Sequence, residues 1–326
     1  MAGNGNNIKE SSDRLEKRKI EDTRSDDEDS YDEEEGSGYE YADELDDESS
    51  DDSGSDIEKN ENGEDIVNVD FDFFDFEEID YHAVNNLLRQ LLDADAPLFE
   101  LSGLADLILK QKVGTTIKTD GKESDPFAML SVVNMKQHAD LPVLTKLRDY
   151  FIDKVKTNLD FYKRLRKLFT SQNKSSVGLV LSERLINMPV EVIPPMYKML
   201  QEELDIQAKE DNSFDFEYYL VLSKVFTEEI SKLEDSDSDS EDERPRKKKV
   251  KQASSDQEYP FHTEDDILHT KATFYHTYTY DREGQEADSK RAFQENGIRP
   301  KGHLMLIKKE KFVELIADME KAYPPY

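Results

Sequence analysis

The amino-acid sequence predicts a single α/β domain at residues 65–326, with a mixed β-sheet flanked by helices. Two observations lead to this prediction. Segments with the period of strands alternate with segments with the period of helices along roughly 230 to 240 residues, which is typical of one α/β domain. The remaining residues, 1–64 and 228–258, are dominated by charge and carry too few apolar side chains to join a core.

The two charged segments are expected to be disordered. Residues 21–65 hold 23 acidic residues against two basic ones. Residues 228–243 hold nine acidic residues and one lysine, and six basic residues follow at 244–251. Such stretches cannot bury enough apolar surface to offset the chain entropy lost on folding. We therefore interpret 1–64 as an acidic tail and 228–258 as a loop inserted into the domain, because the strand segments on either side of it need partners.

The first half of the domain combines three predicted strands with one helix. Apolar and polar residues alternate at 67–73, which is the period of a half-buried strand. Apolar residues then recur at helical spacing over 84–92. Residues 113–119 and 127–135 have the composition of strands, and the second of them is apolar and β-branched enough to be central in the sheet.

Helices and a buried strand follow. Residues 144–155 and 161–168 each carry an apolar stripe at helical spacing. The apolar run at 177–181 has the length of a strand that is buried on both faces. Pro194 and Pro195 stand where a helix can begin, because proline fits the first helical turn.

The end of the domain contains three more predicted strands and a closing helix. Residues 214–226 and 272–280 read as long strands rich in aromatic side chains, and they are separated by the inserted loop. Residues 304–307 predict a last strand. The apolar stripe at 312–319 then predicts the closing helix.

Composition narrows the function classes. The chain has 75 acidic and 43 basic residues and a formal net charge of -32. Nucleic-acid binding needs clustered lysine and arginine, so we expect no direct contact with nucleic acid and basic proteins as the natural partners. The chain has no cysteine, which excludes disulfides and cysteine-based zinc sites. No apolar run approaches the roughly 20 residues that cross a bilayer, so we expect a soluble protein without a membrane partner.

The residues from Leu181 to Pro189, and from Pro194 to Tyr197, resemble the central signature of the BCCIP family, whose fungal members are called Bcp proteins. The resemblance extends over about residues 66–326. Its signature residues are Ser182, Glu183, Arg184, Asn187, Pro189, Pro195, Met196 and Tyr197.

The resemblance implies a fold similar to that of GCN5-related acetyltransferases, without known enzymatic activity. It implies a nuclear chaperone that binds a large-subunit ribosomal protein of the universal L-fourteen class and supports ribosome assembly and nuclear export. The alternatives are a nuclear export adaptor for a non-ribosomal cargo such as a lipid kinase, a histone-type acidic chaperone, and a degenerate acetyltransferase-like enzyme.

Motifs for catalysis or cofactor binding are weak in this sequence. An acetyltransferase holds the acetyl-CoA pyrophosphate on a glycine-rich turn, but the G-x-G motifs of this sequence, such as the one at 36–38, lie in the charged tail. We therefore expect no catalytic residues and no cofactor. The six histidines lack metal-site spacing, so we expect no metal site, and we interpret His276 as a packing residue. Glu183 and Arg184 predict a structural ion pair that holds the turn before Pro189. Met188, Met196 and Met199 fit either core packing or an adaptable partner groove.

Two further motifs lie inside the predicted loop. The basic run typical of nuclear import signals consists of Arg244, Arg246, Lys247, Lys248, Lys249 and Lys251. It predicts an import receptor as a partner and residence in the nucleus, with shuttling to the cytoplasm. Ser236, Ser238 and Ser240 each have an acidic residue three positions later and fit acidophilic kinases. The alternative is that these serines only keep the segment soluble.

Overall fold

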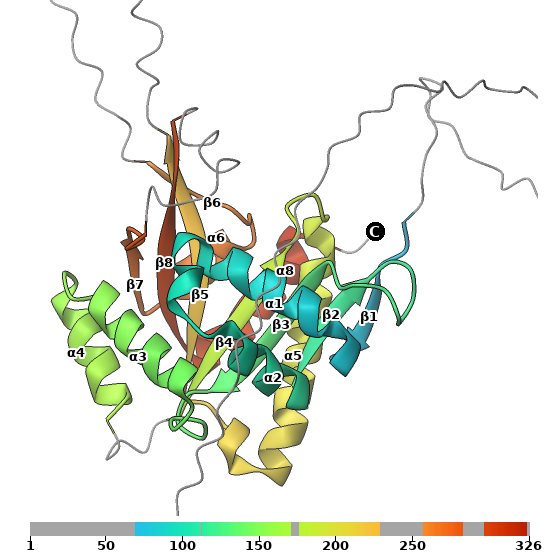
Figure 1. Cartoon of the computed structure of the whole chain (residues 1–326), viewed down its shortest axis with the longest axis horizontal. Coiled ribbons are helices and arrows are strands. Elements are labelled where there is room, and N and C mark those ends of the chain that lie inside the picture. The colour runs from blue at the N-terminus through green and yellow to red at the C-terminus, as the bar shows by residue number, and fades with distance from the viewer. Residues whose placement is uncertain (1–68, 112, 171–175, 229–256, 283–296, 325–326) are drawn as a thin grey trace, which may run out of the picture. The chain divides into compact units, whose positions relative to one another are not determined.

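The computed structural model describes residues 69–111, 113–170, 176–228, 257–282 and 297–324 (Figure 1). These residues belong to one compact unit that spans Lys59–Tyr326. The predicted acidic tail at 1–64 and all but the ends of the predicted loop at 228–258 lie outside the described residues, so their disorder stays a prediction.

In the described residues, eight strands form one mixed sheet. The strand order is β1-β2-β3-β4-β5-β8-β7, and β6 pairs with β5 outside this path. The β4–β5 pair is parallel, and the other pairs are antiparallel. This confirms the predicted α/β class with a mixed sheet, whereas the likeness to acetyltransferases stays a prediction. The strands are β1 (Asp72–Asp75), β2 (Gly114–Lys118), β3 (Ala128–Asn134), β4 (Val177–Arg184), β5 (Tyr218–Glu228), β6 (Glu258–Pro260), β7 (Phe274–Tyr278) and β8 (Ile298–Lys308).

Seven α-helices in the same residues cover the two faces of the sheet (Figure 1). Helices α1 to α4 share one apolar core with the sheet, and α5, α6 and α8 share a second core with the opposite face. The molecule therefore has three layers. The helices are α1 (Tyr81–Leu92), α2 (Leu101–Lys110), α3 (Pro142–Lys154), α4 (Leu159–Leu168), α5 (Ile193–Glu210), α6 (Asp265–Lys271) and α8 (Lys309–Ala322).

The apolar run of strand β4 contributes side chains to the cores on both faces of the sheet. Successive side chains on a strand point to opposite faces of the sheet. Val177, Leu179 and Leu181 join the first core, and Val180 joins the second. Gly178 lies between them because a Cβ there would stand 2.6 Å from Val132 Cγ1. The prediction of a strand buried on both faces is confirmed.

The structure also corrects several predicted boundaries. The last strand, β8, begins at Ile298 and not at residue 304, and it pairs with β5 along its whole length. Its first half is only partly buried and contains Pro300 and Gly302, residues that are depleted in strands. Strand β1 is later and β7 is shorter than predicted. Helices α2 and α6 and strand β6 were missed, and the last two are too short to show a period.

Candidate functional site at the fork between two parallel strands

The parallel strands β4 and β5 diverge at their carboxyl ends. They pair only from Val177 to Val180 on β4 and from Tyr218 to Val221 on β5. Beyond this point β4 continues along β3 as far as Arg184, and β5 continues along β8. In α/β sheets, ligands commonly bind at the carboxyl ends of the strands, where neighbouring strands separate. The fork between β4 and β5 is therefore the candidate functional site.

The chain itself fills the fork. Strand β6 pairs with the edge of β5 that β4 has left, from Glu258 opposite Thr227 to Pro260 opposite Val225. The amide of Phe261 then donates to the carbonyl oxygen of Lys224 over 3.1 Å. The residues that follow reach across to β4. Residues 258–265, which resume the fold after the inserted loop, therefore occupy the fork, and we call them the fork segment.

Glu183 is the centre of the network on the first face of the fork. Its Oε1 lies 2.8 Å from Nε2 of His262, and its Oε2 lies 2.6 Å from Nζ of Lys224. Nζ of Lys224 also donates to the carbonyl oxygen of Gln90 on α1 over 2.9 Å. Burial opposes ionisation of Glu183, but His262 and Lys224 outweigh it and hold the pKa of this carboxyl below its usual value. The network thus joins β4, β5, α1 and the fork segment.

Arg184 is the centre of the network on the opposite face. Its Nε and Nη2 each donate to one carboxylate oxygen of Glu264 over 2.9 Å, and its Nη1 donates to the carbonyl oxygen of Met188, also over 2.9 Å. Burial favours the neutral guanidinium, but Glu264 outweighs it and raises the pKa of Arg184. Next to this pair, the hydroxyl of Ser223 donates to Asp265 over 2.5 Å.

The predicted ion pair between Glu183 and Arg184 is wrong. The two residues are neighbours on β4, and neighbouring side chains on a strand point to opposite faces. Each pairs instead with a residue from the fork segment, Glu183 with His262 and Arg184 with Glu264. One part of the interpretation holds, because Arg184 does fix the turn before Pro189 through its bond to Met188.

The other signature residues serve the turn and the start of α5. Tyr197 and Met196 are buried in the second core, and the Tyr197 side chain interacts with the hydroxyl of Ser182. Pro189 precedes the 3-10 turn Val190–Val192, and Pro195 lies in the first turn of α5. Asn187 is exposed. The signature thus combines a buried network with an exposed turn.

The predicted packing residues are buried or half-buried. Met188 and Met196 are buried and Met199 is half-buried, which favours core packing over a methionine groove. His276 lies 3.0 Å from the hydroxyl of Thr157, in agreement with a packing role. The structure adds a pair that sequence analysis missed, because Nδ1 of His269 lies 3.0 Å from Nε2 of His303. These two histidines come from α6 and β8, and no sequence spacing links them.

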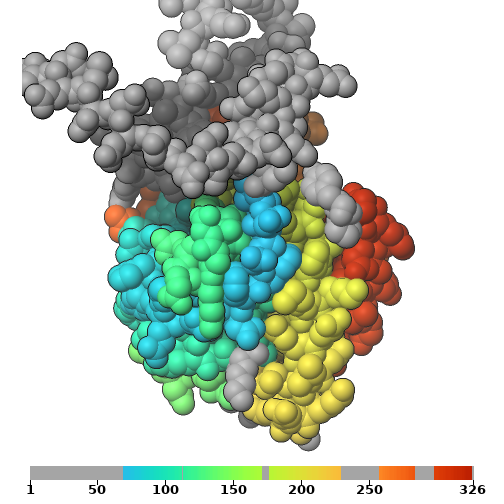
Figure 2. Space-filling view, turned by 90° about the vertical axis from the view of Figure 1, so that its right-hand side faces the viewer, coloured from blue at the N-terminus to red at the C-terminus, as the bar shows by residue number. Residues whose placement is uncertain are grey.

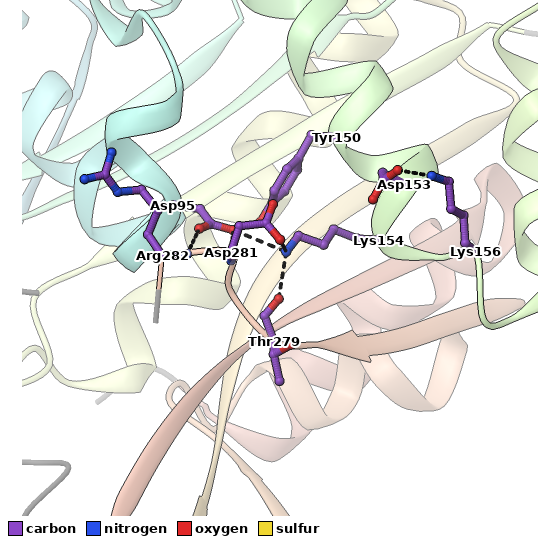
Figure 3. Close-up of polar contacts among 8 residues, drawn as sticks. All are labelled: Asp95, Tyr150, Asp153, Lys154, Lys156, Thr279, Asp281 and Arg282. Atoms are coloured by element: carbon purple, nitrogen blue, oxygen red, sulfur yellow. Dashed lines mark hydrogen bonds and ion pairs between the residues drawn. The ribbon is translucent and has the colours of Figure 1, made fainter. Parts of the chain in front are cut away.

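A second polar cluster joins the helical layer to the exit of β7 (Figure 3). Asp95 is fully buried and accepts hydrogen bonds from the Tyr150 hydroxyl at 2.8 Å and from the amides of Asp281 and Arg282 at 3.0 and 2.9 Å. Nζ of Lys154 lies 3.4 Å from the same carboxylate and donates to Asp281 over 2.8 Å. Because hydrogen-bond donors of the chain itself occupy both oxygens of the Asp95 carboxylate, we assign this cluster a structural role.

A surface cavity of about 650 Å³ lies between α1 and the start of α2. Its lining mixes apolar residues such as Pro97 and Phe99 with charged residues such as Arg89 and Glu100. Gln90, whose carbonyl oxygen binds Lys224, also lines it, so one wall of the cavity touches the fork network.

The described residues show no membrane-crossing helix and no metal-binding cluster. Within them, no helix is long and apolar enough to cross a membrane. Over the same ranges, no group of three or more histidine, aspartate or glutamate side chains is placed to hold a metal ion. The predicted import signal at 244–251 and the serines at 236, 238 and 240 lie outside the described residues.

Asp265 makes the fork sensitive to pH. Burial raises the pKa of Asp265 to about 7, and the carboxylate of Glu264 acts in the same direction, while His262 and the Ser223 hydroxyl oppose both. An unfolded aspartate ionises at about pH 3.9. Between about pH 4 and pH 7 the folded chain therefore holds a proton that the unfolded chain has released, so stability falls as the pH rises through this window.

We expect the variant Asp265→Asn to remove this loss. The amide oxygen of the new side chain can still accept from Ser223, so the hydrogen bond is kept. Between pH 5 and pH 8 the unaltered chain should lose roughly 2 to 3 kcal/mol of unfolding free energy from this carboxyl, and the variant should not lose it. Urea unfolding of both proteins at the two pH values measures this loss. An identical difference at both pH values would contradict the prediction.

Comparisons with known proteins agree on one family. The BCCIP family model matches residues 66–268. "Protein BCP1" of Yarrowia lipolytica is 48% identical over 265 residues, which cover 80% of this chain and 84% of that protein. "Protein BCP1" of Debaryomyces hansenii is 46% identical over 276 residues, which cover 82% and 90%. The crystal structure of BCP1 from Saccharomyces cerevisiae matches with a TM-score of 0.53 at 30% identity, covering 78% of this chain and 89% of that chain.

Proposed function

Because the chain belongs to the BCCIP family, we propose that it is a non-enzymatic nuclear escort of a basic client protein. The client we propose is a large-subunit ribosomal protein of the universal L-fourteen class, held for ribosome assembly and nuclear export. The observation that carries this proposal is the distribution of charge. Most of the net charge of -32 comes from residues 21–65 and 228–243, which hold 23 and nine acidic residues against two and one basic ones.

This distribution suits a basic client. A ribosomal protein away from the ribosome exposes lysine and arginine side chains that normally pair with RNA phosphates. The acidic segments can take the place of RNA and attract such a surface over a long range. The folded unit supplies a fixed shape, so it is the part that can distinguish one basic protein from another.

The filled fork supports a role without catalysis. A ligand at the carboxyl ends of β4 and β5 would have to displace the fork segment, which would take His262 from Glu183 and Glu264 from Arg184. Removing one partner of a buried ion pair is strongly unfavourable, because an uncompensated charge stays behind. The sequence also lacks the glycine-rich turn that an acetyl-CoA pyrophosphate needs.

Affinity purification of the tagged protein with mass spectrometry, at low and at high salt, tests the proposed client. We expect one large-subunit ribosomal protein to remain bound at high salt while other basic proteins are washed away. Retention of histones with the same salt dependence would favour a general acidic chaperone. Retention of a lipid kinase without a ribosomal protein would favour the export adaptor.

Nuclear residence has its own test. Replacing Lys247, Lys248, Lys249 and Lys251 with alanine should move a fluorescent fusion from the nucleus to the cytoplasm, because the acidic groove of an import receptor loses its row of cations. Replacing the serines at 236, 238 and 240 with alanine is the matched control, since it changes the same segment without removing positive charge. The chain has a second, weaker basic run of Arg14, Lys17, Arg18 and Lys19. Unchanged nuclear signal with this run also replaced would contradict the prediction.

A further inference from the structure

The signature turn exposes an isoleucine that the fold does not need. The amide of Met188 donates to the carbonyl oxygen of Leu185 over 3.1 Å, which closes a turn with Ile186 and Asn187 at its two central positions. Ile186 is 75% exposed, more than any other large apolar residue among those the structure describes as exposed. Its side chain therefore contributes little to either core.

The turn is nevertheless held rigidly at both ends. The amide of Leu185 donates to the carbonyl oxygen of Phe127 over 3.0 Å, and the Leu185 side chain packs against the second core. Met188 is buried, and its carbonyl oxygen accepts from Arg184, which is itself clamped by Glu264. The isoleucine therefore projects from a fixed base.

This choice of residue breaks a local rule. Central positions of exposed turns favour proline, glycine, asparagine, aspartate and serine, and Asn187 follows that preference but Ile186 does not. Local choices that conflict with the fold without a structural gain are expected at functional sites. An apolar side chain on a rigid base is also the form that an interface anchor takes.

Acidic side chains lie at the exit of this turn and on the neighbouring hairpin, where the exposed Lys122 is paired with Glu77. From Leu185 to Tyr197 the chain carries one charged residue, Glu191, which is half-buried at the exit of the turn. The bond between Leu185 and Phe127 places the turn beside the β2–β3 hairpin, where Glu123 and Asp125 are exposed. Figure 2 shows the side of the molecule on which this hairpin segment, in green, lies near β1, in blue, and α5, in yellow.

We propose that Ile186 is the apolar anchor by which the folded unit docks its client, inserting into an apolar cleft whose rim carries lysine and arginine. This inference rests on the proposed function and names the surface that performs it. The acidic residues Glu123, Asp125 and Glu191 match the charge of such a rim. Ile186 determines how slowly the client dissociates, and the three acidic residues around the turn determine how fast the client associates.

The test compares Ile186→Ala with Ile206→Ala in the full chain. Ile206 lies on α5 and is 54% exposed, so the control removes the same atoms from another exposed site. The probe is the purified ribosomal protein of the universal L-fourteen class, immobilised for interferometry. We expect Ile186→Ala to raise the dissociation rate about tenfold at physiological and at high salt, and Ile206→Ala to leave it unchanged. The triple variant Glu123→Gln, Asp125→Asn and Glu191→Gln should lower the association rate at low salt only.

The outcomes separate the two claims. Equal dissociation rates for the two isoleucine variants would overturn the anchor and leave the proposed function standing. No binding by the unaltered chain would overturn the proposed function and the anchor with it. Thermal unfolding should be the same for both variants, because both side chains are exposed. A change in sedimentation of the free protein caused by Ile186→Ala alone would assign the turn to self-association and overturn the proposal.

Discussion

Replacing Arg184 with methionine is expected to lower the free energy of unfolding by about 3 to 5 kcal/mol. The side chains of Arg184 and Glu264 are 7% and 5% exposed, so the substitution leaves a buried carboxylate without its partner. It also frees the carbonyl oxygen of Met188, which Arg184 binds. Methionine keeps much of the aliphatic volume, so the loss reports the charge and not a cavity. Urea denaturation followed by circular dichroism measures it.

Two further variants test whether the lost stability comes from the unpaired buried charge. The double variant Arg184→Met with Glu264→Met removes both charges and should recover most of the lost stability, because a buried pair replaced by apolar side chains is often neutral. The exposed pair of Lys198 and Glu320 provides the control, and Lys198→Met should change stability by less than about 0.5 kcal/mol. A loss below about 1 kcal/mol for Arg184→Met alone would mean that water reaches the pair and that the fork is not sealed.

Deleting residues 1–64 is expected to slow client association several-fold at low salt without abolishing binding. The tail carries most of the acid excess, and attraction between exposed charges acts over roughly 8 to 10 Å at physiological salt. Long-range attraction acts mainly on the association rate. The truncated protein should therefore show a flatter salt dependence and keep its preference for one ribosomal protein. Stopped-flow mixing with the client over a range of salt concentrations measures both quantities.

A matched control separates charge from length. A tail of unchanged length, with its aspartates and glutamates replaced by asparagine and glutamine, should behave like the deletion, because the proposed effect depends on charge. If the neutral tail instead restores the original association rate, the tail acts through its bulk and not through its charge. Loss of all discrimination among basic proteins after truncation would mean that the tail alone binds clients, as in a general acidic chaperone.

Apart from α2, α6 and β6, the order of elements could be predicted from the sequence because local patterns determine it. The run at 177–181 is apolar at every position except its glycine, and it forms the strand that serves both cores. Pro194 and Pro195 mark the start of α5, as predicted. The resemblance to the BCCIP family, based on the residues around Ser182, is confirmed by the family match over 66–268.

The fork could not be predicted because its contacts are remote in the chain. Glu183 and His262 are 79 residues apart, and Arg184 and Glu264 are 80 apart. Sequence analysis ended the strand at Leu181, which hid the alternation that sends Glu183 and Arg184 to opposite faces. The signal was present in part, since a strand extended through Arg184 would have separated the two charges. Nothing local indicates that β4 and β5 diverge, because β3 and β8 determine their courses.

The most direct test of the central claim is the equilibrium affinity of the full chain for the ribosomal protein of the universal L-fourteen class, measured at physiological salt beside a histone and another basic ribosomal protein. The proposed escort should bind its client at least about a hundredfold more tightly than either competitor, because the folded unit and the acidic tail act together on that client alone. Similar affinities for all three proteins, rising and falling together with salt, would contradict the claim and leave a chaperone that recognises only charge.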